Sequence, residues 1–179
     1  MLVIGPARAP RVVDRQVIEL SDASVPTSRQ PYHAVMAAPR GERTALERRL
    51  RGTVERVTRR SLARLLARYR VQGRTVRGLA LVVGSVIDPA SIGNDHIRAH
   101  ALEGQLFRTA LERAAGRGRV PCATHVERGL YEAAAARLKR TPTELKRRVA
   151  ALGRAVGGPW RAEEKTATLA AWMALARAH

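Results

Sequence analysis

Residues 77–111 constrain the fold most, because a continuous apolar run is followed there by a polar loop and an amphipathic helical pattern. The run Gly78–Val83 is short, β-branched toward its end and free of alternation, which is typical of a strand buried on both faces of a parallel sheet. Asp88-Pro89 interrupts the run, and Asn94 or Asp95 suits the N-cap of the next helix. The stretch therefore predicts a strand, a loop and a helix in that order.

Three polar residues share the apolar face of this predicted helix. His96, His100 and Glu103, spaced i, i+4 and i+7, lie on the same face as Phe107 and Leu111, so we expect them to point toward the sheet. They also lie beside the carboxyl end of the preceding strand, where ligand crevices form in open α/β sheets. Two interpretations stay open: a ligand site, or a structural pair of histidines that holds a buried glutamate.

The remaining segments extend this unit into an α/β fold. A helical pattern runs from residue 42 to residue 70, Val120–Val126 predicts a second buried strand, and helices are expected over 129–138, over 141–152 and from Trp160 onward. The order strand, helix, strand, helix implies parallel strands joined by right-handed crossovers. The helix from Trp160 is apolar nearly all round after its first turn, so we expect it to pack on the sheet.

The N-terminal 41 residues form the least regular part of the chain. Prolines separate two β-like runs there, Val12–Leu20 and His33–Ala38, which predict edge strands or a hairpin, with a flexible arm as the alternative. The expected architecture is a three-layer α/β fold in which a mostly parallel sheet has flanking helices. Its main part is predicted over residues 42–179, and the N-terminal β-hairpin over residues 1–41 belongs to the same domain.

The charge balance points to a polyanionic partner. Lysine and arginine total 33 against 15 acidic residues, a formal net charge of +18, which favours nucleic acid ahead of an anionic membrane surface. Aromatic residues make up only 3% of the chain, so base stacking on an aromatic platform is poorly supported. DNA or RNA bound through its backbone is therefore the expected partner, with a second copy of the chain as the other one considered.

Apolar runs and cysteines bound the location and the redox chemistry. No run of about 18 apolar residues occurs, and the first ten residues lack a signal-peptide pattern, so a cytoplasmic protein is expected. Cys122 is the only cysteine, which excludes an internal disulfide and any multi-cysteine zinc site.

One face of the predicted helix over 42–70 is strongly basic. Six of its arginines occupy a single arc of the helical wheel opposite the apolar residues, with only Glu47 and Glu55 among them or near the edge of the arc. A solvated face is the usual fate of charged residues, but like charges on one stripe repel one another, so we predict that this face contacts phosphate. The residues of the predicted nucleic-acid-binding face are Arg48, Arg49, Arg56, Arg59, Arg60 and Arg70.

The second half of the chain resembles the RuvC-type Holliday junction resolvases of the RNase H-like superfamily. The likeness covers roughly residues 77–179, and RTPTELKRRVAALGRA at 140–155 and EEKTATLAAWMALARAH at 163–179 carry it. The resemblance implies an RNase H-like fold in which paired carboxylates hold two divalent metal ions for phosphodiester cleavage.

Several carboxylates of that family pattern are displaced in this chain. The run HAVMAAP lacks the expected first-strand aspartate, so Asp14 or Glu19 would have to replace it. At the end of the buried strand stands Ser85, with Asp88 three residues later, and Glu163 and Glu164 open the last helix. The chain therefore either builds a different metal site or has kept the fold without the chemistry.

Three functions follow from these residues. The first is a nucleic-acid-binding protein that acts as a metal-dependent nuclease on structured DNA. Asp88, Glu103 and Glu164 would be its magnesium or manganese ligands, and His96 and His100 would be the general base and an orienting residue, in either order. The second is a catalytically inactive nucleic-acid-binding or scaffold module. The third is a zinc or iron enzyme that uses the histidines and Glu103, with His125 or Cys122 nearby.

Overall fold

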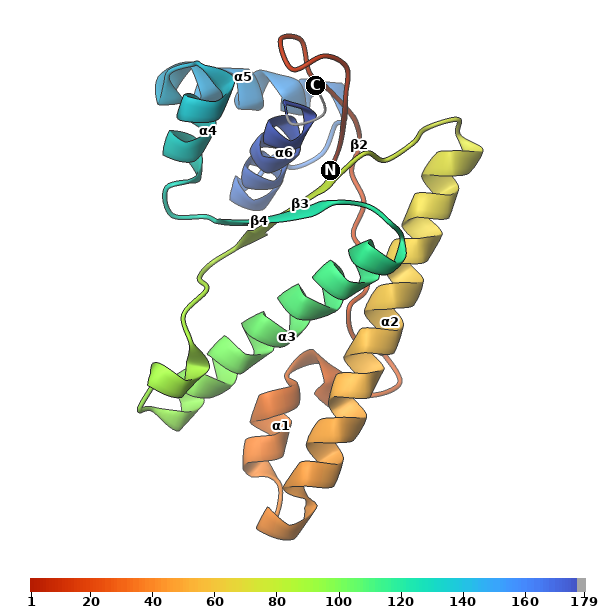
Figure 1. Ribbon diagram of the computed structural model, residues 1–179, viewed down its shortest axis with the longest axis vertical. Helices are drawn as coiled ribbons and strands as arrows, with labels where there is room; N and C mark the ends of the chain where they lie inside the picture. Colours follow the sequence, from red (N-terminus) through yellow and green to blue (C-terminus); the bar gives the residue numbers. More distant parts are fainter. Residues whose placement is uncertain (177–179) are drawn as a thin grey trace. The chain divides into compact units, whose positions relative to one another are not determined.

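The computed structural model describes residues 1–176, and backbone contacts divide the chain into two units (Figure 1). Unit 1 contains Met1–Val17, Arg77–Gly84 and the chain from Pro121 onward. Unit 2 contains Ile18–Val76 and Ser85–Val120. The chain therefore passes between the units four times, and each unit is built from segments that are distant in sequence.

Unit 2 is helical. Its α-helices pack on one another pairwise (Figure 1). The core of the unit holds Val54, Leu106 and Ala110, with Tyr32 and Phe107 packed against them. The elements of unit 2 are η1 (Pro26–Arg29), α1 (Pro31–Ala37), η2 (Arg40–Glu42), α2 (Arg43–Val71), η3 (Pro89–Ser91) and α3 (Asp95–Arg117).

The two long helices of unit 2 confirm the sequence prediction, whereas α1 corrects it. The helical pattern over 42–70 corresponds to α2, and the side chain of Asn94 caps α3 by accepting a hydrogen bond from the Ile97 amide at 3.0 Å. The predicted strand His33–Ala38 is wrong, since these residues belong to α1 and its C-cap. The local reason is Pro31 at the first helical position, where its fixed φ and missing N–H favour a helix start.

Unit 1 combines two small sheets with three α-helices. β1 (Leu2–Ile4) pairs with β2 (Arg11–Asp14) antiparallel, and β3 (Leu79–Val83) pairs with β4 (Cys122–Val126) parallel. The register of the parallel pair runs from Leu79 opposite Cys122 to Val83 opposite Val126, as expected for two apolar runs joined by a helical crossover. The helices of the unit are α4 (Leu130–Leu138), α5 (Pro142–Leu152), η4 (Gly153–Ala155) and α6 (Ala162–Leu175).

Helix α6 is the centre of the unit 1 core. It packs on β3, β1, α4 and α5, which confirms the prediction that the helix after Trp160 packs on the sheet. Trp172 is fully buried, and its indole Nε1 donates a hydrogen bond to the carbonyl of Ala7 at 2.7 Å. Leu145 and Leu169 are also fully buried in this core. A helix that is apolar on all sides is stable here because neighbours surround it.

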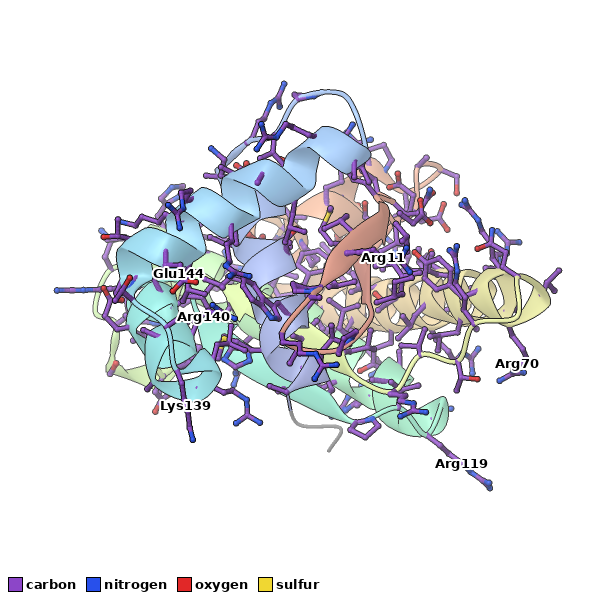
Figure 2. All side chains as sticks on the ribbon, turned by 90° about the horizontal axis from the view of Figure 1, so that it is seen from above. Arg11, Arg70, Arg119, Lys139, Arg140 and Glu144 are labelled. Atoms are coloured by element: carbon purple, nitrogen blue, oxygen red, sulfur yellow. The ribbon has the colours of Figure 1, made fainter. Side chains whose placement is uncertain are left out.

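Local contacts fix the α5–α6 corner. Thr141 caps α5 by accepting from the Glu144 amide, as its sequence pattern predicts. Desolvation acts to raise the pKa of the Glu144 carboxyl, but hydrogen bonds and charge from Arg140 and Arg148 outweigh it and hold that pKa below its ordinary value (Figure 2). At the other end of the helix, the Trp160 ring lies directly over Gly153, so no larger residue fits at position 153.

The predicted three-layer, mostly parallel sheet is wrong. Within residues 1–176 the structure contains two two-stranded sheets and six α-helices. The strand predictions around β3 and β4 are correct, but the run His33–Ala38 folds as a helix, so it cannot extend the parallel pair. A β-hairpin does form in this region, but between β1 and β2: β2 overlaps the start of the predicted run Val12–Leu20, and its partner is Leu2–Ile4 and not His33–Ala38.

Candidate functional site

Three histidines meet between α1 and α3 of unit 2. His33 comes from the first turn of α1, while His96 and His100 lie one turn apart at the start of α3. The His33 ring centroid lies 4.8 Å from that of His96 and 4.3 Å from that of His100, and the last two are 4.8 Å apart. One ring nitrogen of each histidine lies within 4.8 Å of the others. We call these residues the histidine cluster.

Glu103 holds the cluster from the buried side. Its side chain is 9% exposed, and Oε1 accepts from His33 Nδ1 at 2.9 Å and from the His33 amide at 3.3 Å. The amide contact matters for α1, because no side chain at Gln30 caps this helix. Glu103 thus supplies a carboxylate to the N-terminus of α1, where the helix dipole favours negative charge. Its other oxygen lies 3.7 Å from His100 Nδ1.

The other ring nitrogen of His33 has no hydrogen-bond partner among residues 1–176. Nε2 is buried, and no hydrogen bond to it is found among the described residues. The His100 side chain is 54% exposed, and His96 is exposed as well, so the cluster has a buried face at Glu103 and an open face toward solvent. An exchangeable ligand could reach the open face.

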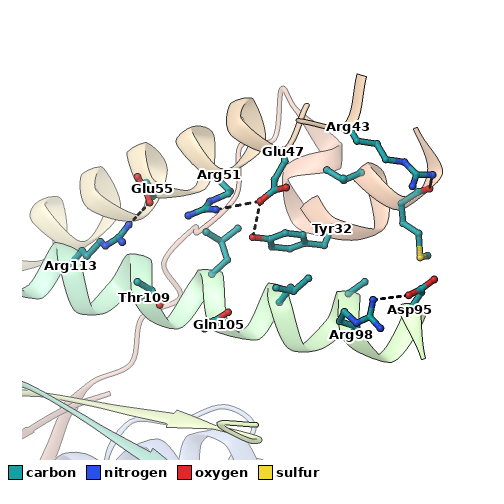
Figure 3. Close-up of a pocket in the computed structure, with 15 residues that line it drawn as sticks. Tyr32, Arg43, Glu47, Arg51, Glu55, Asp95, Arg98, Gln105, Thr109 and Arg113 are labelled. Atoms are coloured by element: carbon teal, nitrogen blue, oxygen red, sulfur yellow. Dashed lines mark hydrogen bonds and ion pairs between the residues drawn. The ribbon is translucent and has the colours of Figure 1, made fainter. Parts of the chain in front are cut away.

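A groove of about 680 Å³ is lined by residues of α1, α2 and α3 (Figure 3). Arginine–glutamate ion pairs line the groove: Arg51 contacts Glu47 at 3.3 Å, and Arg113 contacts Glu55 at 2.7 Å. Tyr32 lies at the α1 end with its hydroxyl 3.5 Å from Glu47, and burial raises the pKa of this phenol. The charges lining the groove are therefore largely neutralised by one another.

The predicted nucleic-acid-binding residues form an exposed face of α2. All six arginines are exposed, and they extend over the 23 residues from Arg48 to Arg70. Arg70 projects outward from the end of its helix (Figure 2). The one ion pair found for the face in residues 1–176 joins Arg56 to Asp22 at 3.9 Å. We call Arg48, Arg49, Arg56, Arg59, Arg60 and Arg70 the α2 basic face.

Asp22 is the carboxylate that forms an ion pair with this face within residues 1–176. Hydrogen bonds from Ser24 hold the pKa of the Asp22 carboxyl below its ordinary value, with smaller contributions from the charges of Arg56 and Arg60. Asp22 therefore offsets part of the charge of Arg56 and Arg60, and the other four arginines of the face have no ion pair within residues 1–176.

The carboxylates predicted as metal ligands contact structural partners instead of one another. Asp88 is exposed and accepts from the Ala90 amide, so it caps η3. Glu164 belongs to unit 1, where it accepts from the Arg161 amide at the start of α6 and lies 3.6 Å from Arg15. Glu103 contacts His33, as described above. In the described part of the chain, the histidine cluster is the one group of three or more potential ligand side chains close enough to share an ion.

The orientation expected for His96, His100 and Glu103 needs a correction. These residues were expected to point toward the sheet, but their partner is His33 of α1. Sequence reasoning missed His33 because it lies 63 positions before His96 in a run interpreted as a strand. The available signal was Pro31, which as a helix start places His33 in the first turn of α1. His125 and Cys122, considered as further ligands, lie on β4 of unit 1.

No protein-family model, curated protein or solved structure matches this chain. Among residues 1–176, no helix combines the length and the apolar composition that crossing a bilayer requires.

Proposed function

We propose that the protein binds nucleic acid through the phosphate backbone, with the α2 basic face as its main contact. The observation that supports this most directly is the exposure of six arginines on one face of a continuous 29-residue helix. Neutralising phosphates releases condensed counterions, which is the main source of sequence-independent affinity for nucleic acid.

The distribution of acidic residues in unit 2 supports this assignment. Glu55 lies one turn before Arg59, at the edge of the basic face, but its carboxylate pairs with Arg113 of α3, while Glu47 pairs with Arg51. Arg59, at the centre of the face, forms no ion pair in the described chain. A solvated surface ordinarily mixes paired charges of both signs, so a basic face whose neighbouring α2 carboxylates pair with other arginines favours an external anion.

The geometry suits contact with a backbone more than insertion between bases. Arg70 lies 22 positions after Arg48, which is about 33 Å along the axis of α2 and close to one turn of B-form DNA. No aromatic residue lies on the arc of the face, so stacking on unpaired bases is not expected to contribute.

An anionic membrane is a weaker match to the same surface. The positions between the arginines on this arc carry small side chains, including Ala45, Gly52 and Ala63. A helix that lies in a bilayer interface needs large apolar residues beside its basic ones. The face therefore offers charge to a partner without a hydrophobic anchor.

The proposal is limited to binding. A two-metal cleavage mechanism needs carboxylates free to ligate, whereas Asp88 caps η3 and Glu103 contacts His33. The catalytically inactive alternative of the sequence analysis is therefore the version that the contacts of these two residues favour.

The test is the salt dependence of binding to a fluorescein-labelled 20-base-pair DNA duplex, to the RNA duplex of the same sequence and to one single strand. A variant with Arg48, Arg49, Arg56, Arg59 and Arg60 changed to Gln loses up to five phosphate contacts. Each contact contributes about 0.9 to the slope of log K against log salt on duplex DNA, so the slope should fall by as much as about 4.5.

A charge-matched variant separates this face from net charge alone. Changing five exposed arginines of unit 1 to Gln removes the same formal charge from other surfaces: Arg8, Arg128, Arg147, Arg154 and Arg161. We expect this control to keep most of the slope. Equal losses in both variants would contradict the assignment to α2, and binding only to phosphatidylserine vesicles would overturn the proposal in favour of a membrane.

A further inference from the structure

We propose that His33, His96 and His100 form a binding site for a divalent transition-metal ion, zinc in the first place, and that Glu103 positions His33 for it. This inference is independent of nucleic-acid binding, since none of these four residues belongs to the α2 basic face.

The spacing of the imidazoles is close to what a single ion requires. Zinc–nitrogen bonds of about 2.0–2.1 Å in tetrahedral geometry place ligand nitrogens roughly 3.3 Å apart. The three candidate nitrogens already lie within 4.8 Å of one another. His96 and His100 are exposed, so small side-chain rotations can close the difference without moving buried atoms. The backbone already places the three imidazoles near one another, so metal binding requires only side-chain rotations that shorten the distances between their nitrogens.

Glu103 prepares His33 as a ligand by fixing its tautomer. An ionised carboxylate only accepts hydrogen bonds, so the 2.9 Å contact to Oε1 places a proton on His33 Nδ1. In the neutral ring, Nε2 then carries the lone pair that a metal binds. Metal-ligating histidines commonly donate their other N–H to a carboxylate in this way.

The unpartnered Nε2 of His33 is the second observation that points to a ligand. A buried acceptor without a donor is unfavourable, and buried polar groups in native proteins nearly always have a partner. A metal ion would supply that partner. Purely structural imidazole packing would leave this nitrogen unsatisfied, so packing alone does not account for the arrangement.

The donor atoms select the class of metal. Imidazole suits zinc, copper, nickel and iron, whereas magnesium and manganese prefer carboxylate, carbonyl and water oxygens. The cluster therefore differs from the magnesium or manganese site expected from Asp88, Glu103 and Glu164. In the histidine cluster, Glu103 contacts the ligand His33 and is not itself a ligand.

The coordination that three histidines provide is open. Closed structural zinc sites use four protein ligands, while three protein ligands leave a position for water or another small ligand. Residue 97 is isoleucine, so the pair His96 and His100 lacks the glutamate of the HExxH metalloprotease pattern. The site we infer is thus a solvent-accessible metal ion held by three histidines and a bound water, without the adjacent glutamate that serves as general base in the HExxH pattern.

The test is a titration of the chain, prepared without a histidine tag, with cobalt(II) followed by competition with zinc. Tetrahedral coordination gives strong visible absorption, which zinc should abolish and magnesium should leave unchanged. Azide should perturb the spectrum if the fourth position is open. His96→Ala and His100→Ala should each weaken cobalt binding more than 100-fold, beyond the roughly 10–100-fold effect of losing a supporting carboxylate. His125→Gln, outside the cluster, should bind as the wild type does.

Glu103→Gln tests the positioning role and should weaken metal binding about 10–100-fold while the cobalt spectrum stays tetrahedral. A melting curve with and without zinc shows whether this variant folds, and His96→Ala, at an exposed position, keeps the test decisive if it does not. The proposal is overturned if the wild type shows only weak octahedral absorption, or if His96→Ala and His100→Ala bind cobalt as tightly as His125→Gln. Each result is independent of the salt slopes measured for α2.

Discussion

Replacing Trp172 should have the largest effect on stability of any single substitution in unit 1. Its side chain is fully buried among α6, β3 and α4, and the indole Nε1 donates to the Ala7 carbonyl at 2.7 Å. Removing a buried tryptophan side chain costs about 3–5 kcal/mol, against a total of about 5–15 kcal/mol for a typical domain. Trp172→Ala should therefore leave unit 1 marginally folded at best.

Trp172→Phe separates the hydrogen bond from the packing. The phenyl ring keeps most of the apolar volume but has no N–H, so we expect a loss of about 1–2 kcal/mol. Both variants retain Trp160 as their only tryptophan, which also belongs to unit 1. Its fluorescence during urea unfolding, with circular dichroism as a second probe, reports the stability of this unit. A loss below about 1 kcal/mol for Trp172→Ala would refute the central role of α6.

Gly153→Ala should destabilise the protein by about 1–3 kcal/mol, because a methyl group at this position overlaps the Trp160 ring. Gly52→Ala should stabilise it by about 0.5–1 kcal/mol, because this position within α2 has open space around it. Thermal melts in which both substitutions shift the stability in the same direction would contradict the packing argument. Glu144→Gln should be less stable than the wild type at pH 7 and equal to it at strongly acidic pH. The folded-state pKa of this carboxyl is lowered, so its contribution is present above the unfolded-state pKa and is lost as the pH falls through the folded one; a gap independent of pH in urea titrations would exclude this ion pairing. A chain that ends at Pro159 lacks α6, so we expect that unit 1 does not fold in it. This chain contains no tryptophan, so circular dichroism is the probe, and a cooperative melt with the wild-type β-sheet signal would contradict the expectation.

Local patterns were sufficient wherever an element is specified by its own residues. The structure contains the elements that these patterns predicted: the strands of the apolar runs at β3 and β4, the helices capped by Asn94 and Thr141, and α2, whose apolar residues recur with helical periodicity. The pairing of β3 with β4 also followed, because a helical crossover between two buried strands favours a parallel arrangement.

The larger architecture could not be obtained in this way. His33–Ala38 is a short apolar run, and periodicity alone does not separate a short buried strand from a buried helical turn. That one assignment put a predicted edge strand where the structure has the helix α1. Nor does the sequence indicate that unit 1 is assembled from three separate segments, since segment pairing depends on contacts between residues far apart in the chain.

The candidate sites show the same division between local and long-range information. The sequence by itself determined that the chain is strongly basic, that six arginines share one face of α2, and that His96, His100 and Glu103 share one face of α3, because helical periodicity places residues on faces. Only the tertiary structure decided what each face meets. Packing of α1 against α3 brought His33 to Glu103 and joined a third imidazole to the other two, a contact across 70 positions that no local pattern specifies.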